Sequence, residues 1–155
     1  RRAYRTRKFG TWERSLELDA KVIAVGESEG IHFAFDKTER TPNTVDAHRI
    51  IWFADQHGCQ DAVVEALFRA YFTEGKDIGN RQTLVDVAAV AGMDRIAAEA
   101  MLSSNDAMEA ISNGREVADR HHGDGVPFFI INHAIALPGA QAPETFLDAF
   151  KQASS

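Results

Sequence analysis

The chain has 155 residues, of which 45% are hydrophobic and 26% are charged, as in an ordinary globular domain with enough apolar material for a core. No apolar run approaches the roughly 20 residues that a membrane-spanning helix needs, so no membrane association is expected. The single cysteine, Cys59, excludes an internal disulfide and a cysteine-based zinc site. The start of the chain has no signal-peptide pattern, and we expect a cytoplasmic location.

The first ten residues are strongly basic, with five Arg or Lys residues and no acid, whereas the whole chain carries a net charge of −6. A solvated charged terminus is the favoured interpretation of this arm, and phosphate binding is the alternative. Nucleic-acid binding is not expected, because no basic stripe continues and no nucleic-acid-binding motif follows. The chain begins with Arg1 rather than Met, which indicates a fragment or the removal of a preceding segment.

Two elements are expected before residue 40. Apolar residues at helical spacing predict a helix from Thr11 to about Gly26. The alternation of apolar and polar residues over 31–35 predicts a short strand or extended segment.

A loop over residues 40–44 precedes the largely helical middle of the chain. Pro42 disfavours the helical conformation at Thr41, and the side chain of Asn43 or Thr44 can cap the next helix. The loop therefore ends where a helix begins.

The middle of the chain is expected to be helical. The predicted helices are Val45–His57, a helix capped by Asp61 and ended by Gly75, Gln82–Ala91, Asp94–Leu102, and Asp106 to about His121. The second of these has the strongest amphipathic pattern, an apolar stripe formed by Val64, Leu67, Phe68, Tyr71 and Phe72.

The end of the chain has a different character. The apolar run Phe128–Ile131 predicts a buried strand, Asn132 and His133 a tight turn, and residues 134–137 a partner strand. Pro143 is placed to open a final helix. A hairpin followed by a helix therefore closes the chain.

Histidine and cysteine residues offer little support for a metal or redox site within the chain. His121 and His122 are adjacent, and adjacent side chains on a helix point about 100° apart, so no metal site is predicted. Cys59 lies in a helix–helix connection, where an incidental thiol is favoured over a regulatory one.

Six stretches carry a family pattern: Arg7–Gly10, Glu29–Ile31, Arg40–Arg49, Glu65–Ile78, Gly125–Asn132 and Gly139–Phe146. In this order they resemble the DsbA-like branch of the thioredoxin superfamily, and within it the FrnE-type protein disulfide oxidoreductases. The resemblance implies an α/β, thioredoxin-like fold with a large helical insertion. Residues 1–123 would form that insertion, with a short extended segment near 31–35, and residues 124–155 the closing hairpin and helix of the thioredoxin-like domain.

The resemblance also implies a binding site. Pro127 would be the cis-proline that faces the active-site thiols of the family, and the backbone of Val126 would pair with an extended substrate. A rigid turn that enters a strand is the alternative interpretation of Pro127. A further group would line a wall of the same cleft, namely Thr41, Pro42, Asn43, Thr44 and His48. A helix-capping loop with a buried His48 explains this second group equally well.

The Cys-x-x-Cys motif of the family does not occur in the sequence, so no catalytic residue is predicted within the chain. The resemblance implies a parent oxidoreductase that exchanges disulfides with protein or small-molecule thiols and needs no cofactor. Glutathione-dependent isomerases and transferases of the hydroxychromene carboxylate and kappa types are an alternative, in which glutathione would be bound. A non-catalytic peptide-binding module is a third hypothesis, because an unpaired strand edge invites another chain, as in a homodimer.

Overall fold

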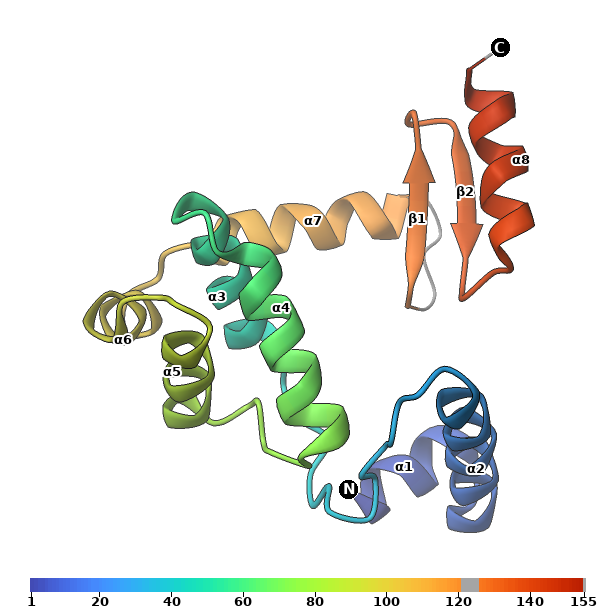
Figure 1. Ribbon diagram of the computed structural model, residues 1–155, viewed down its shortest axis with the longest axis horizontal. Coiled ribbons are helices and arrows are strands. Elements are labelled where there is room, and N and C mark those ends of the chain that lie inside the picture. Colours follow the sequence, from blue (N-terminus) through green and yellow to red (C-terminus); the bar gives the residue numbers. More distant parts are fainter. Residues whose placement is uncertain (121–125, 155) are drawn as a thin grey trace. The chain divides into compact units, whose positions relative to one another are not determined.

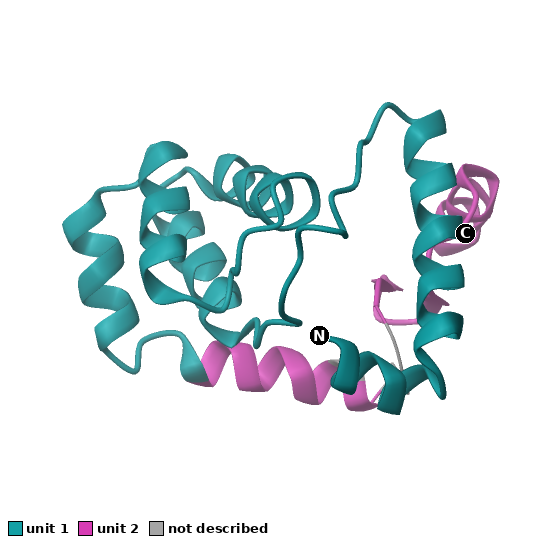
Figure 2. Cartoon of the chain, turned by 90° about the horizontal axis from the view of Figure 1, so that it is seen from below, with its two compact units in different colours: residues 1–108 teal, residues 109–155 magenta. Residues whose placement is uncertain are grey.

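The computed structural model describes residues 1–120 and 126–154. Contacts divide the chain into two compact units, Arg1–Met108 and Glu109–Ser155, which Figure 2 colours separately. His121 and His122, and with them the predicted end of the helix that follows Asp106, lie outside the described residues. The boundary predicted from the sequence is a different one, between residues 123 and 124, where the helical insertion would end and the closing part of the thioredoxin-like domain would begin. That boundary stays a prediction.

The first unit is helical in its described elements, and the second contains a hairpin (Figure 1). In the first unit the elements are α1 Arg2–Phe9, α2 Trp12–Ser28, α3 Val45–Gln56, α4 Gln60–Phe68, the π-helix η1 Arg69–Thr73, α5 Arg81–Val90 and α6 Arg95–Ser103. In the second they are α7 Met108–Arg120, which starts at the last residue of the first unit, β1 Phe128–Ile131, β2 Ile135–Pro138 and α8 Pro143–Ala153. Within the described parts of the chain, no helix combines the length and apolarity needed to cross a membrane.

The basic start of the chain is a helix, α1, and the prediction of a solvated arm is wrong for two of its arginines. The guanidinium groups of Arg1 and Arg5 both bind the carboxylate of Asp19 on α2. Arg5 also donates to the hydroxyl of Ser15, which is fully buried. A carboxylate that leaves water needs opposite charge and hydrogen bonds, and two guanidinium groups supply both.

Residues 31–35 do not form the short strand that was predicted as one of two possibilities for this segment, the other being an extended segment. The backbone N–H of Ala34 donates to the carbonyl oxygen of Phe72 at 2.8 Å. The rings of Phe33 and Phe35 stack with centroids 4.9 Å apart, and both meet the ring of Phe72 edge-on. The alternation of apolar residues therefore reflects aromatic packing against η1 rather than pairing in a sheet.

Helices α3 to α6 enclose the main apolar core, whose largest fully buried members are Ile50, Val63, Leu84 and Leu102. The apolar stripe predicted for the helix that is now α4 and η1 is partly wrong. The buried residues are Val63, Leu67 and Ala70, whereas the side chain of Phe68 is 56% exposed. Val63, Leu67 and Ala70 have the spacing of one helix face, and the side chain of Phe68 points about 100° away from that of Leu67, which takes it off this face. The helix changes from α to π at Arg69.

Gly75 turns the chain after η1 in a conformation that favours glycine. Its φ is +72°, and a Cβ atom there would lie 2.5 Å from Cβ of Lys37 and 3.0 Å from the Lys37 carbonyl carbon. We expect Gly75→Ala to lower the free energy of unfolding by about 2–3 kcal/mol, because left-handed strain and overpacking act together. Urea denaturation measures this change.

Gly58→Ala is the matched control, since Gly58 has a similar φ of +68° but no heavy atom within 4 Å of the added Cβ. It should cost only the backbone strain, about 1 kcal/mol. Equal losses in the two variants would contradict the role assigned to the contact with Lys37.

The second unit contains the predicted hairpin. Strands β1 and β2 are antiparallel, with Phe128 opposite Pro138 and Ile131 opposite Ile135. Residues 132–134 connect the strands, and Asn132 and His133 have the positive φ values, 48° and 57°, that a tight hairpin turn favours. Helix α8 packs on β1, where the rings of Phe129 and Phe146 meet edge-on with centroids 4.8 Å apart. The hairpin, its turn and the final helix predicted from the sequence are confirmed, with the second strand one residue later than predicted. The prediction that the first strand is buried is wrong, because its residues are half-buried or exposed.

Candidate functional site: a strand edge and a helix-capping loop

Val126 and Pro127 lie directly before β1. The peptide bond between them is cis, the geometry that the resemblance implies. The carbonyl oxygen of Pro127 accepts a hydrogen bond from the N–H of Gly139 at 2.8 Å, which continues the pairing of the hairpin by one residue. The side chain of Val126 is 95% exposed. Pro127 is thus fixed to the hairpin, and Val126 projects from it.

Strand β1 has one edge paired with β2, and in the described parts of the chain it pairs with no other strand. Successive side chains of a strand point to opposite faces. Phe129 lies against α8, so Phe128 and Ile130 belong to the opposite face of the hairpin, and both are half-buried. The backbone N–H and C=O groups along the second edge of β1 could form hydrogen bonds with an added extended chain.

The loop before α3 caps the helix, as predicted. The side-chain oxygen of Asn43 accepts a hydrogen bond from the backbone N–H of Val45 at 3.0 Å. Thr44 is the residue before the first helical position, and its side chain makes no capping hydrogen bond. Thr41 is exposed and Pro42 is half-buried. Asn43, rather than Thr44, therefore satisfies the free N–H at the start of α3.

His48 is exposed. The alternative interpretation of residues 41–44 and His48 is therefore right about the capping loop and wrong about a buried His48. The residue that turns inward is its neighbour, Arg49, whose side chain is 2% exposed. On α3 the two side chains diverge by about 100°, and only one of them can face the core.

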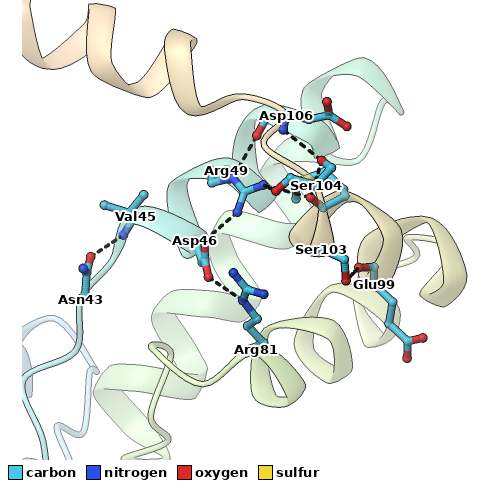
Figure 3. A network of polar contacts seen from close by, with 10 residues as sticks. Asn43, Val45, Asp46, Arg49, Arg81, Glu99, Ser103, Ser104 and Asp106 are labelled. Atoms are coloured by element: carbon cyan, nitrogen blue, oxygen red, sulfur yellow. Dashed lines mark hydrogen bonds and ion pairs between the residues drawn. The ribbon is translucent and has the colours of Figure 1, made fainter.

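Arg49 is the centre of a buried polar network (Figure 3). Its Nη1 donates to Oδ1 of Asp46 at 2.8 Å, one turn earlier on α3. Its remaining donors reach carbonyl oxygens that follow α6 or end it: Nε to Asp106 at 2.9 Å, and Nη2 to Met101 at 2.9 Å and Ser104 at 2.7 Å. The five N–H groups of a guanidinium suit such a cluster of acceptors. Arg49 thus ties α3 to the end of α6.

Asp46 connects this network to a second arginine. Its other oxygen, Oδ2, accepts a hydrogen bond from Nε of Arg81, the first residue of α5, at 3.0 Å. Partial burial by itself would raise the pKa of Asp46, but the hydrogen bonds and charges of Arg49 and Arg81 outweigh it and lower the pKa below its usual value. The start of α3 is therefore held by an ionised carboxylate.

The lowered pKa predicts a dependence of stability on pH. The unfolded chain binds the proton more readily than the folded one, so the contribution of Asp46 is complete above the ordinary pKa of about 3.9. It is lost as the pH falls through the lower pKa of the folded state. We expect Asp46→Asn to lower the free energy of unfolding at pH 7 by about 1–2 kcal/mol and to flatten its decrease below pH 5.

Chemical denaturation at a series of pH values measures both effects. Asp55→Asn is the control, because Asp55 is exposed on the same helix. A decline below pH 5 that is the same in Asp46→Asn and the unsubstituted protein would contradict the assignment.

The structure groups the candidate residues in two places. Thr41, Pro42, Asn43, Thr44 and His48 lie together in the first unit, and Val126 and Pro127 together in the second. Their membership of one cleft stays a prediction. Cys59 is half-buried before α4, with Sγ 3.7 Å from the carbonyl oxygen of Ala54. Among the described residues, no three His, Cys, Asp or Glu side chains gather as metal ligands would.

Comparisons with known proteins identify the family. Residues 5–151 match the model of the DSBA-like thioredoxin domain, and the chain belongs to this family. Its structure is similar to the crystal structure of a probable DsbA oxidoreductase from Streptomyces coelicolor, with a TM-score of 0.83 and 29% sequence identity. The match covers 96% of this chain but 64% of the other, and no curated protein gives a match. The predicted α/β fold, a helix-rich variant of the DsbA-like thioredoxin fold, is thereby confirmed.

Proposed function

We propose that this chain is the C-terminal part of a FrnE-type thiol–disulfide oxidoreductase, in which it supplies the substrate platform and a helical lid. The observation that carries the proposal is the position of Val126. In a member of the DSBA-like family, an exposed residue directly precedes a strand whose second edge is unpaired in the described chain. An extended polypeptide would bind there through main-chain hydrogen bonds, with little demand on its sequence.

The reaction requires two thiols, and the sequence described here has one cysteine. In the proposed reaction, a thiolate of a Cys-x-x-Cys pair outside these residues attacks a substrate disulfide and forms a mixed disulfide as a substrate thiolate leaves. The second cysteine then attacks the mixed disulfide, which releases the reduced substrate and leaves the enzyme pair oxidised. Oxidation of a substrate dithiol is the same sequence in reverse. The matched Streptomyces chain is longer than this one, which is consistent with such a segment.

The remaining parts of the proposal concern the surroundings of the reaction. The loop before α3 and His48 would form a wall of the substrate cleft, in which the exposed side chains of Thr41 and Asn43 face the substrate. Substrates would be protein or small-molecule thiols and disulfides, and the reaction would take place in the cytoplasm without a cofactor.

Disulfide exchange by the natural gene product, with all residues encoded before Arg1, tests the proposal. The loss of free thiols from a reduced, unfolded protein would be followed with the oxidised enzyme in stoichiometric amount. We expect oxidation well above the rate in buffer and no dependence on glutathione. Inactivity towards thiols, combined with glutathione-dependent isomerisation or conjugation, would contradict the proposal and favour the glutathione-dependent class.

A further inference from the structure

A cleft of about 510 Å³ lies in the first unit, between α2 and the segment over residues 35–39. Most of its surface is apolar and is provided by one face of α2 together with an aromatic ring, namely Trp12, Leu16, Ala20, Ile23 and Phe35. A cavity of about 150 Å³ holds one benzene molecule. The cleft therefore has room for two or three apolar side chains.

Helix α2 is apolar over a wider arc than the first unit covers. At 100° per residue, Trp12, Leu16 and Ile23 lie within about 40° of one another around the helix axis. The buried residues Ser15 and Asp19 lie on the adjacent face, where the arginines described above bind them. Leu16 is nevertheless 46% exposed. Apolar residues gathered on one helix face indicate a surface that another part of a protein covers.

Arg1 forms part of the same cleft. Its side chain is 11% exposed and binds the carboxylate of Asp19, on α2, at 2.7 Å. The guanidinium also donates to the carbonyl oxygen of Phe35 and lies 5.8 Å from the centroid of that ring. Arg1 is thus held from both sides of the cleft, and any residues joined to its backbone nitrogen begin there.

We propose that the cleft binds the residues that directly precede Arg1 in the natural protein, and that these residues place apolar side chains against Trp12 and Leu16. The inference rests on the proposed function, which assigns a preceding segment to this protein. The matched Streptomyces chain is long enough to contain such a segment.

The covalent link to Arg1 favours this occupant over a separate molecule. A segment on a short tether has an effective concentration in the millimolar range, so weak apolar contacts are sufficient to hold it. Five residues span at most about 18 Å. The residues within about five positions of Arg1 are therefore the ones that would lie in the cleft.

Photo-crosslinking of the natural protein tests the proposal. Leu16 would be replaced by p-benzoylphenylalanine, and the irradiated protein would be digested and its crosslinked peptides sequenced by mass spectrometry. We expect Leu16 to crosslink to a peptide that contains the residues directly before Arg1. The same replacement at Ala20, which is also exposed in the cleft, should give the same peptide.

Val90 is the matched control position, because it is 88% exposed on α5 and does not line this cleft. It should give no crosslink to that peptide. Crosslinks from Leu16 and Ala20 only to residues 109–155 or to a second protein molecule, or no crosslink from either position, would overturn the proposal. Disulfide exchange by the same protein would still be measured, so a failure of this inference is distinguishable from a failure of the proposed function.

Discussion

Arg49→Met is expected to lower the free energy of unfolding by about 3–4 kcal/mol, because it removes a buried guanidinium from its hydrogen-bond partners. The guanidinium satisfies three carbonyl oxygens, from Met101, Ser104 and Asp106, together with the carboxylate of Asp46. Methionine fills a similar volume but donates no hydrogen bond. The Met101 oxygen would keep its hydrogen bond from Ser104, and Asp46 its bond from Arg81. The carbonyl oxygens of Ser104 and Asp106 would lose the donor that Arg49 supplies, and each such loss costs about 1–3 kcal/mol.

Urea denaturation at pH 7 measures this effect, and Arg95→Met is its control. Arg95 forms an exposed ion pair with Asp86, of the kind that contributes about 0–1 kcal/mol. A loss below 1 kcal/mol for Arg49→Met would mean that water replaces the guanidinium without cost, and that the network does not hold α3 to α6.

Val126→Pro is expected to reduce kcat/KM for a protein substrate by at least about tenfold in the natural protein, as follows from the proposed function. Proline removes the backbone N–H that β-augmentation requires, and one such hydrogen bond contributes about 1–1.5 kcal/mol. Val126→Ala keeps that N–H, and because the side chain is 95% exposed it should remain within about twofold of the unsubstituted protein.

The comparison of these two variants separates backbone binding from side-chain binding. Equal impairment of both would show that the valine side chain is recognised, and unchanged activity in Val126→Pro would contradict the platform. The free energy of unfolding of each variant shows whether the hairpin is retained.

Local sequence signals were sufficient for most of the helices and for the hairpin. The helix from Val45 was predicted within one residue of α3, because its apolar spacing and the loop before it agree. Asn132 and His133 adopt the left-handed backbone of a tight turn, and the two strands lie on either side of it. The capping by Asn43 is equally local, since it involves a residue two positions away.

The features that the sequence did not predict depend on distant partners. In the sequence nothing distinguishes Arg49 from an exposed arginine on α3. The carbonyl groups that make its burial favourable follow more than 50 residues later. In the same way, Asp19 gives the basic start of the chain a buried partner that no short-range pattern indicates. The pair Asp46 and Arg49, three residues apart on one helix, was the available signal for the network, but such pairs are common on exposed helices.

The intact mass of the natural protein, with the coding sequence upstream of Arg1, tests most directly the proposal that this chain is the later part of a thiol–disulfide oxidoreductase. We expect a mass above the 17.1 kDa of residues 1–155, from a preceding segment of several tens of residues that contains Cys-x-x-Cys. Serine in place of the first cysteine would instead favour the glutathione-dependent class. A mass of 17.1 kDa with no upstream coding sequence would contradict both enzymatic accounts and leave a peptide-binding module.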